Sequence, residues 1–467
     1  MPAPTPPPNN KGPQVPSSGR AGPIDDSHSL ADYRRPVPEP VSQSEDSRSA
    51  NRSRARTAVL RRRILAGVLV VLVAIGVTGG LLLHHLNGNI RTQTLVGAGT
   101  AKEKQTGPIN ILVMGSDTRD SEANCALGGG CAKTTATSNT AAEAQGANAD
   151  VIMIVHIAAD RSNATVLSIP RDTVVKIPAC TLDGKTIPAR TDRINASLMG
   201  GPSCTAQTVG QLTGITINHF VVIDFAGVVT MSDAVGGVEV CVDNNVYDTY
   251  SHLKLAKGTH TLEGKAALEF LRTRHGFGDG GDVGRTIAQH LFLSSMIRQV
   301  ESAATLANPV KVYNLADAAT KAVTVDDDLG SVTALSSLLL EIKDIPSNRI
   351  TFVTTPTDYN PANMNELILA PNAEALFKKI ADDVSLSHKK TTPTPTKTKS
   401  PGSSTSGTPS ATPSASASSS APDYATTADS ATGCAQVSTY KTVTLKGVPM
   451  TPTRAYELSP DVPDSAN

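Results

Sequence analysis

The sequence contains no tryptophan, and aromatic residues make up only 3% of its 467 residues. Proteins that hold single-stranded nucleic acids usually stack the bases on aromatic side chains in a basic groove. Here 42 lysines and arginines balance 42 aspartates and glutamates, so the formal net charge is zero. The scarcity of aromatic residues and the lack of excess positive charge argue against a general nucleic-acid-binding function, and we expect no nucleic-acid partner.

Familiar catalytic and metal-binding motifs are also missing. The sequence has no GxSxG, P-loop, HExxH or CxxC motif, and its histidines lack the spacing of zinc ligands. One GxGxxG match, Gly276–Gly281, lacks the βαβ context of a dinucleotide site. Ser116 and Ser168 end strand-like runs without an evident histidine partner, so covalent catalysis is not expected. His156 and His219 lie in apolar runs typical of core positions.

Large apolar side chains are almost absent from two long segments. Residues 1–57 are rich in proline, serine, asparagine and charge, and residues 389–422 are nearly all threonine, serine, proline, lysine and alanine. Such segments bury too little apolar surface to offset the entropy of the chain, so we expect both to be disordered or extended.

One long apolar run is present. Ile64–Leu83 is uncharged and about 20 residues long, enough to cross a bilayer. A signal peptide is the alternative, but a long polar segment precedes the run, which exceeds a typical signal core. Arginines crowd its amino-terminal side, at positions 52, 54, 56, 61, 62 and 63. The positive-inside rule therefore predicts a single-pass membrane protein with a cytoplasmic N-terminus and an extracytoplasmic body.

These patterns divide the chain into six parts. They are a disordered cytoplasmic tail (1–63), a transmembrane helix (64–83), an extracytoplasmic linker (84–106), a folded catalytic domain (107–388), a Ser/Thr/Pro-rich linker (389–422) and a short C-terminal tail (423–467). The C-terminal tail has one strand-like run and no predicted chemical role.

All six cysteines follow the apolar run, as expected for an oxidising exterior. Cys125 and Cys131 bracket a glycine-rich loop, and Cys180 and Cys204 flank an irregular segment. We predict these two disulfides, although spacing cannot fix connectivity and leaves Cys241 and Cys434 open.

Charged residues recur where strand-like runs end or begin. In Thr165–Pro178 an apolar run stops at Pro170 and is followed by Arg171 and Asp172. The run 110–114 likewise leads to Asp117 and Arg119, and Asp150 opens a third run. Ligands of open α/β sheets gather at the carboxyl ends of strands. One such pair would be read as a surface ion pair, but repetition favours a site for an anion with a divalent cation.

A second arginine cluster lies further along the chain. We predict that Leu268–His275 is extended, because the glycine-rich residues that follow would break a helix. The guanidinium groups of Arg272 and Arg274 would then share one face and need an anion to neutralise them. In a helix they would diverge into solvent. Next comes an amphipathic helix that carries Arg285 and Gln289 on one face, with its positive end suited to phosphate.

Eight ordered segments together resemble the LytR-CpsA-Psr family of bacterial cell-envelope phosphotransferases. They are NILVMGSDTRD, NADVIMIVHI, SIPRDTVVKIP, DRINAS, TGITINHFVVIDF, GGVEV, LEFLRTRH and DVGRTIAQ. The resemblance is strong over Gly107–Val300 and weak over Tyr313–Val384. It implies an α/β fold with three α-β-α layers and a mixed central sheet, preceded by one transmembrane helix. It also implies transfer of a glycopolymer phosphate from a polyprenyl diphosphate carrier in the membrane to peptidoglycan.

The resemblance implies a role for each matching residue. Asp117 and Asp150 correspond to the acidic residues around Mg²⁺, and together with Arg171 they form the expected catalytic group. The expected diphosphate-binding residues are Arg119, Arg171, Arg193, Arg272, Arg274, Arg285 and Gln289, with Asp172 and Asp282 orienting them. The chain departs from the usual pattern at Arg193 (often lysine), Ala288 (often arginine) and His290 (often glutamine).

Two other functions remain open at this point. One is an envelope-linked sensor or transcriptional attenuator without transferase activity, which would need a structured cytoplasmic domain. The other is hydrolysis of the polyprenyl diphosphate, with water in place of the glycan acceptor, which would also appear as a pyrophosphatase side activity of a transferase.

Overall fold

The computed structural model describes residues 44–96, 107–116, 148–182, 184–301, 307–386, 426–427 and 433–466. The chain divides into two compact units, Met1–Ile75 and Gly76–Asn467. The predicted sites Asp117 and Arg119 and the cysteine pair Cys125 and Cys131 lie outside the described residues.

The first element is a long helix, α1 (Ser44–Asn89). Its part from Arg63 to Asn89 is long and apolar enough to cross a membrane, with a mean hydropathy of 2.6 and no burial of its most apolar stretch. One N-terminal helix therefore fits a single-pass membrane protein. However, α1 begins well before Ile64, which corrects the prediction of a disordered tail up to residue 63. Arginine and alanine are good helix formers, so they can extend a helix that the apolar run has nucleated.

The body is built on an eight-stranded mixed sheet, in the order β1-β14-β9-β2-β3-β4-β15-β18. Its strands are β1 (Arg91–Gln93), β2 (Ile109–Ser116), β3 (Ala149–Ile157), β4 (Ala164–Ser168), β9 (His219–Ile223), β14 (Val323–Asp326), β15 (Ile350–Thr354) and β18 (Thr426–Thr427). β2 is parallel to β9 and antiparallel to β3, while β4 is antiparallel to β3 and parallel to β15. As a result β2, β4 and β9 all end at the edge of the sheet where β3 begins.

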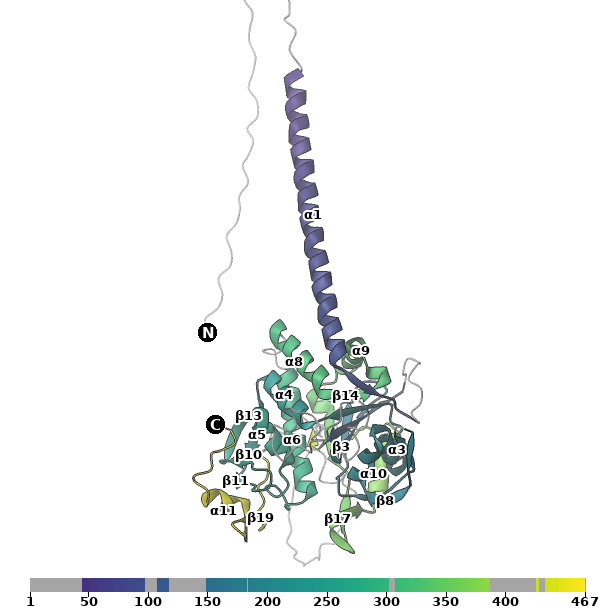
Figure 1. The fold of residues 1–467 in the computed structure, drawn as a ribbon, viewed down its shortest axis with the longest axis vertical. Coiled ribbons are helices and arrows are strands. Elements are labelled where there is room, and N and C mark those ends of the chain that lie inside the picture. The colour runs from purple at the N-terminus through teal and green to yellow at the C-terminus, as the bar shows by residue number, and fades with distance from the viewer. Residues whose placement is uncertain are drawn as a thin grey trace, which may run out of the picture. The chain divides into compact units, whose positions relative to one another are not determined.

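Helices cover both faces of this sheet (Figure 1). The larger helices of the body are α3 (Pro202–Thr213), α4 (Phe225–Val235), α5 (Gly264–Arg272), α6 (Asp282–Glu301), α8 (Pro309–Ala322), α9 (Val332–Ile342) and α10 (Ala373–Ala381). Leu112 and Met114 of β2 share a buried cluster with α3 and α10, whereas Ile111 and Val113 face clusters that α6 and α9 help to form. This alternation is the period of a strand buried on both faces. The predicted three-layer α/β fold is confirmed.

Smaller elements complete the body. They are β5 (Val174–Ile177), β6 (Cys180–Leu182), β7 (Lys185–Ile187), β8 (Arg190–Arg193), β10 (Val238–Val242), β11 (Val246–Tyr247), β12 (Lys254–Leu255), β13 (Gly258–Leu262), β16 (Thr357–Asn360), β17 (Asn363–Leu369), β19 (Val443–Leu445), β20 (Val448–Met450), α11 (Pro452–Glu457) and the short 3-10 helices Ile194–Gly200, Asp327–Leu329 and Ser347–Arg349.

Two disulfides lie within the described residues. Cys180 is bonded to Cys204, as predicted, and Cys241 is bonded to Cys434. The second bond joins residues 193 positions apart in the sequence. It attaches the C-terminal segment to a separate apolar cluster formed by the β10–β13 ribbon, α5 and α6.

Candidate functional site

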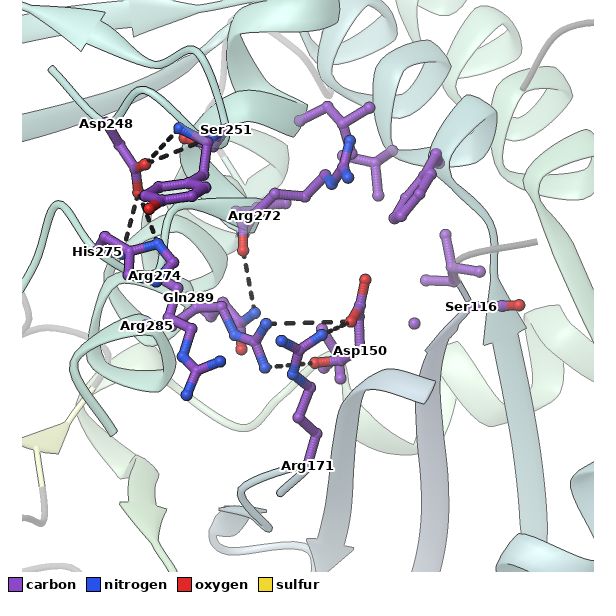
Figure 2. Close-up of a pocket in the computed structure, with 18 residues that line it drawn as sticks. Ser116, Asp150, Arg171, Asp248, Ser251, Arg272, Arg274, His275, Arg285 and Gln289 are labelled. Carbon is purple, nitrogen blue, oxygen red and sulfur yellow. Dashed lines mark hydrogen bonds and ion pairs between the residues drawn. The ribbon is translucent and has the colours of Figure 1, made fainter. Parts of the chain in front are cut away.

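A pocket of about 220 Å³ opens at the edge of the sheet where the three strands end (Figure 2). Its polar lining consists of Ser116, Asp150, Arg171, Asp248, Tyr250, Ser251, Arg272, Arg274, His275, Arg285 and Gln289. Its apolar lining consists of Val151, Ile223, Phe225, Val228, Leu268 and Leu271. The sheet topology brings these residues together, because β2, β4 and β9 end, and β3 begins, at this edge.

Asp150 and Arg171 form the central ion pair of the pocket (Figure 2). The backbone carbonyl of Asp150 also accepts a hydrogen bond from Arg285 Nη2, 3.3 Å away. Burial opposes the charge on Arg171, but the nearby carboxylates of Asp150, Asp282 and Asp172 outweigh it and raise the pKa of Arg171. The guanidinium group is therefore a permanent, fixed cation.

Asp172 lies next to three guanidinium groups and is only 3% exposed. Its carboxylate is 3.5 Å from Arg193 Nη1, 3.6 Å from Arg274 Nη2 and 3.9 Å from Arg171 Nε. One buried negative charge thus offsets the repulsion among three cations that come from distant parts of the sequence. This position behind the cluster suits an orienting residue.

Asp282 is the first residue of α6 and connects it to the loop after β4. Its carboxylate accepts a hydrogen bond of 2.8 Å from the backbone N–H of Arg171 and pairs with Arg285 one turn later. Burial and the charge of Asp172 raise the pKa of Asp282, while the two arginines oppose that shift. Burial likewise lowers the pKa of Arg285 from its very high ordinary value. An anion at the start of α6 also suits the helix dipole.

Arg272 and Arg274 reach the pocket by a different route from the one predicted. Arg272 is the last residue of α5, and the chain turns at Thr273, so the predicted strand is wrong. Ala266, Ala267 and Phe270, spaced three and four positions apart, are buried in one apolar cluster and so stabilise a helix there. Because the helix ends between the two arginines, they do not diverge, and both still line the pocket. Arg272 stacks on Phe225, with 4.8 Å between its guanidinium carbon and the ring centre.

No sequence pattern pointed to the loop that follows β11. Asp248 is fully buried and accepts backbone hydrogen bonds from both this loop and the loop after α5. The centre of the Tyr250 ring lies 4.3 Å from the centre of the His275 ring. Burial and the surrounding arginines lower the pKa of His275, while Asp248 opposes this shift. Asp248 shares no periodic pattern with the arginines, so only tertiary contacts reveal it.

Several buried donors at the pocket have no hydrogen-bond partner among the described residues. They are the Nε atoms of Arg171, Arg274 and Arg285 and Nδ1 of His275. Buried polar groups are nearly always satisfied in native proteins, and open guanidinium donors match the oxygen atoms of an anion. The arrangement is therefore suited to a phosphate-bearing ligand.

The remaining predicted residues occupy different positions. Gln289 lines the pocket and donates a hydrogen bond of 3.1 Å to the carbonyl of Leu271. Arg193, on β8, is 46% exposed and contacts Asp172 without lining the pocket. Within the described residues no group of three or more acidic, histidine or cysteine side chains is placed to hold a metal ion.

One buried serine does have a histidine partner. Ser168 Oγ lies 2.6 Å from Nε2 of His290, and burial lowers the pKa of His290 to about 3. This corrects the expectation that Ser168 has no such partner, because the two residues are 122 positions apart and meet only where α6 packs on β4. Neither residue lines the pocket, and both are buried, so the contact belongs to the core. His156 and His219 are also buried, as expected.

A model of the LytR_cpsA_psr family matches residues 84–382, which is more than half of the chain. The chain belongs to the LytR_cpsA_psr family. The resemblance that the eight segments suggested is thereby confirmed, and the family match spans every described residue that lines the pocket.

Curated members of the family are similar over much of this chain. The cell wall biosynthesis protein LcpA of Corynebacterium glutamicum is 30% identical over 317 residues, covering 63% of this chain and 59% of LcpA. A TagU of Bacillus mycoides, named as a polyisoprenyl-teichoic acid–peptidoglycan teichoic acid transferase, is 25% identical over 53% of this chain and 75% of its own length. The solved LytR-Csp2A-Psr enzyme from Actinomyces oris is 22% identical, with a TM-score of 0.47 over 62% of this chain and 96% of its own.

Proposed function

We propose that this protein transfers a glycopolymer phosphate from a polyprenyl diphosphate carrier to peptidoglycan. The observation that carries the proposal is a single pocket in which fixed arginines face an apolar wall. The name of the TagU relative, a teichoic acid transferase acting on peptidoglycan, supports the same kind of reaction, and that of LcpA supports a role in cell wall biosynthesis.

The arginine side of the pocket fits a diphosphate. Arg171, Arg272, Arg274 and Arg285 line it from the loop after β4, the end of α5, the α5–α6 loop and α6. Among the described residues, the Nε atoms of three of them, Arg171, Arg274 and Arg285, have no hydrogen-bond partner. Planar guanidinium groups bind phosphate oxygens in pairs, which neutralises charge and fixes orientation together. Asp172 and Asp282 hold Arg171, Arg274 and Arg285 before any ligand binds, so little ordering cost remains for these three.

The apolar lining of the pocket fits a prenyl chain. Its wall combines Ile223 at the end of β9, Phe225 and Val228 of α4, and Leu268 and Leu271 of α5. Each buried methylene of a lipid contributes roughly 0.8 kcal/mol. A ligand with a diphosphate next to a hydrocarbon chain satisfies both halves of the pocket at once.

The proposed reaction is an in-line substitution at the phosphorus next to the glycan. A hydroxyl oxygen of peptidoglycan forms a bond to that phosphorus, and the bond to the bridging oxygen breaks. Polyprenyl phosphate leaves with the bond electrons, and the arginines stabilise the charge that develops on it. We assign the hydroxyl proton to Asp150, because its side chain is 16% exposed, whereas that of Asp248, the other described pocket carboxylate, is fully buried.

Mg²⁺ is part of the proposal, held by Asp150 and Asp117. Asp150 lines the pocket beside the arginines. One or two carboxylates plus substrate phosphate oxygens form a donor set that Mg²⁺ commonly accepts in proteins. When bound, the ion would supply additional neutralisation of the diphosphate charge.

The proposed location is the outer face of the cell membrane. The apolar part of α1 would cross the bilayer, and the arginines before it would keep the N-terminus in the cytoplasm. The two disulfides among the described residues support an oxidising compartment.

The deciding experiment supplies the purified full chain with a lipid-linked diphosphate glycan, Mg²⁺ and peptidoglycan oligomers. We expect equal amounts of polyprenyl phosphate and glycan-bearing oligomer, and no transfer when a chelator removes the metal. Arg171→Ala should lower kcat/KM by at least about 100-fold, since it removes a charged contact to the diphosphate. The matched control is Arg161→Ala, which removes an arginine paired with Glu341 outside the pocket.

Other outcomes separate the alternatives. Polyprenyl phosphate without modified oligomer would indicate a hydrolase. Full activity of Arg171→Ala would disprove the site, and absence of any turnover would leave the sensor function as the better explanation.

A further inference from the structure

The C-terminal segment Gly433–Ala466 is part of the folded body, although the family match ends at residue 382. The Cys241–Cys434 disulfide attaches it to β10. Ala435, Val443 and Ala455 are at most 1% exposed, which is typical of core positions and not of a loose tail.

This segment runs behind the loop that links α5 to α6. Residues 436, 437, 438 and 442 contact residues 275–278 and 280 of the loop. Val437 pairs with Phe277 as an antiparallel bridge, the Gly278 N–H donates to the Gln436 carbonyl (2.9 Å), the Ser438 N–H donates to the Gly276 carbonyl (2.9 Å) and Thr442 Oγ1 donates to the His275 carbonyl (2.6 Å).

Gly280 shows how closely the α5–α6 loop and the C-terminal segment approach each other. Its φ of +78° is unfavourable for other residues, and a Cβ there would lie 2.1 Å from Cγ2 of Thr442. The loop conformation and the position of Thr442 are therefore fixed together.

The same segment also holds the other loop at the pocket, residues 248–251. Thr249 Oγ1 donates a hydrogen bond of 3.0 Å to the carbonyl of Thr444. On the inner side, Asp248 accepts the backbone N–H groups of His275 and Gly276. The two loops are thus tied to each other by Asp248 and to the C-terminal segment from outside.

We infer that Gly433–Ala466 is a positioning brace, which holds Arg274 and His275 in place for the diphosphate. No residue of the brace lines the pocket, whereas Arg274 and His275 both do. The brace therefore acts through the two loops and touches no substrate. This inference rests on the proposed function for its ligand, but the contacts themselves do not depend on that function.

The sharpest test is Thr442→Val in the full chain, which keeps the shape of the side chain and removes its hydroxyl. The matched control is Thr453→Val. Thr453 belongs to the same C-terminal segment, and its Oγ1 also donates a hydrogen bond to a backbone carbonyl, that of Asn245 (2.9 Å). We expect Thr442→Val to accelerate amide hydrogen exchange across residues 275–281 and to weaken binding of geranylgeranyl diphosphate by about fivefold. The control should change neither.

Amide hydrogen exchange and diphosphate affinity together distinguish failure of this inference from failure of the proposed function. Faster exchange with unchanged diphosphate affinity would reduce the brace to a structural element and overturn the inference, as would unchanged exchange in both variants. Calorimetric affinity needs no turnover, so a chain that binds the diphosphate but transfers nothing would refute the proposed function and leave the brace standing.

A second experiment removes the whole brace without changing any of its residues. A protease site placed within residues 389–422 allows the full chain to be cut while Cys241–Cys434 still holds the brace. Cutting alone should leave diphosphate affinity unchanged, and cutting followed by reduction should lower it by at least about tenfold. Reduced but uncut protein controls for loss of Cys180–Cys204. Retained affinity after the brace has been separated would overturn the inference.

Discussion

The buried His290 predicts an unusual dependence of stability on pH. Burial holds the pKa of His290 at about 3 in the folded protein, against about 6.5 in an unfolded chain. Between these values the unfolded state binds one more proton than the folded state, so stability falls as pH falls. The effect begins near pH 6.5 and continues to about pH 3.

Its size follows from proton linkage. At pH 5 the unfolded histidine is almost fully protonated while the folded one is neutral, which amounts to about 2 kcal/mol of lost stability relative to pH 7. His290→Gln removes the titrating group and can still accept the hydrogen bond of Ser168. We therefore expect the variant to lose about 2 kcal/mol less than the natural chain between pH 7 and pH 5.

Urea unfolding of residues 84–467 at both pH values, followed by circular dichroism, measures this difference. Fluorescence of tryptophan is no alternative, because the chain has none. His260→Gln, on β13, is the control and should retain the pH dependence of the natural chain. Identical pH dependence in the natural chain and His290→Gln would refute the reasoning, since it would mean that His290 accepts a proton in the folded state.

Two further predictions concern the pocket wall and the first disulfide. Phe225→Ala removes the ring beneath Arg272 and part of the apolar wall, so KM should rise about tenfold or more for a long-chain prenyl substrate and much less for a short-chain analogue; an equal rise for both would contradict the division of the pocket. Replacing Cys180 and Cys204 together by serine should lower the free energy of unfolding by about 3 kcal/mol, because the bond closes a loop with a sequence separation of 24. Thermal unfolding against the natural chain measures this, and an unchanged midpoint would argue against the entropic reasoning.

Local patterns predicted the central part of the fold well. Apolar runs became β2, β3, β4 and β9, and the helix that carries Arg285 begins at Asp282 as α6. These predictions succeeded because strand and helix periodicity depend on neighbours in sequence. The prediction for Arg272 failed for the converse reason. Its conformation depends on how Ala266, Ala267 and Phe270 pack in the core, which competes with the helix-breaking glycines that follow.

By itself, the sequence determined the apolar helix, the α/β alternation, the family and most of the charged residues at the pocket. Only the tertiary structure revealed Asp248, the Ser168–His290 contact and the Cys241–Cys434 bond, which join residues far apart in the chain. The tertiary structure also placed the C-terminal segment, for which the sequence predicted no role, against the loops at the pocket. The physical reason is that a charge run or an apolar run is a local property, whereas burial and hydrogen-bond partners depend on which segments meet in the folded chain.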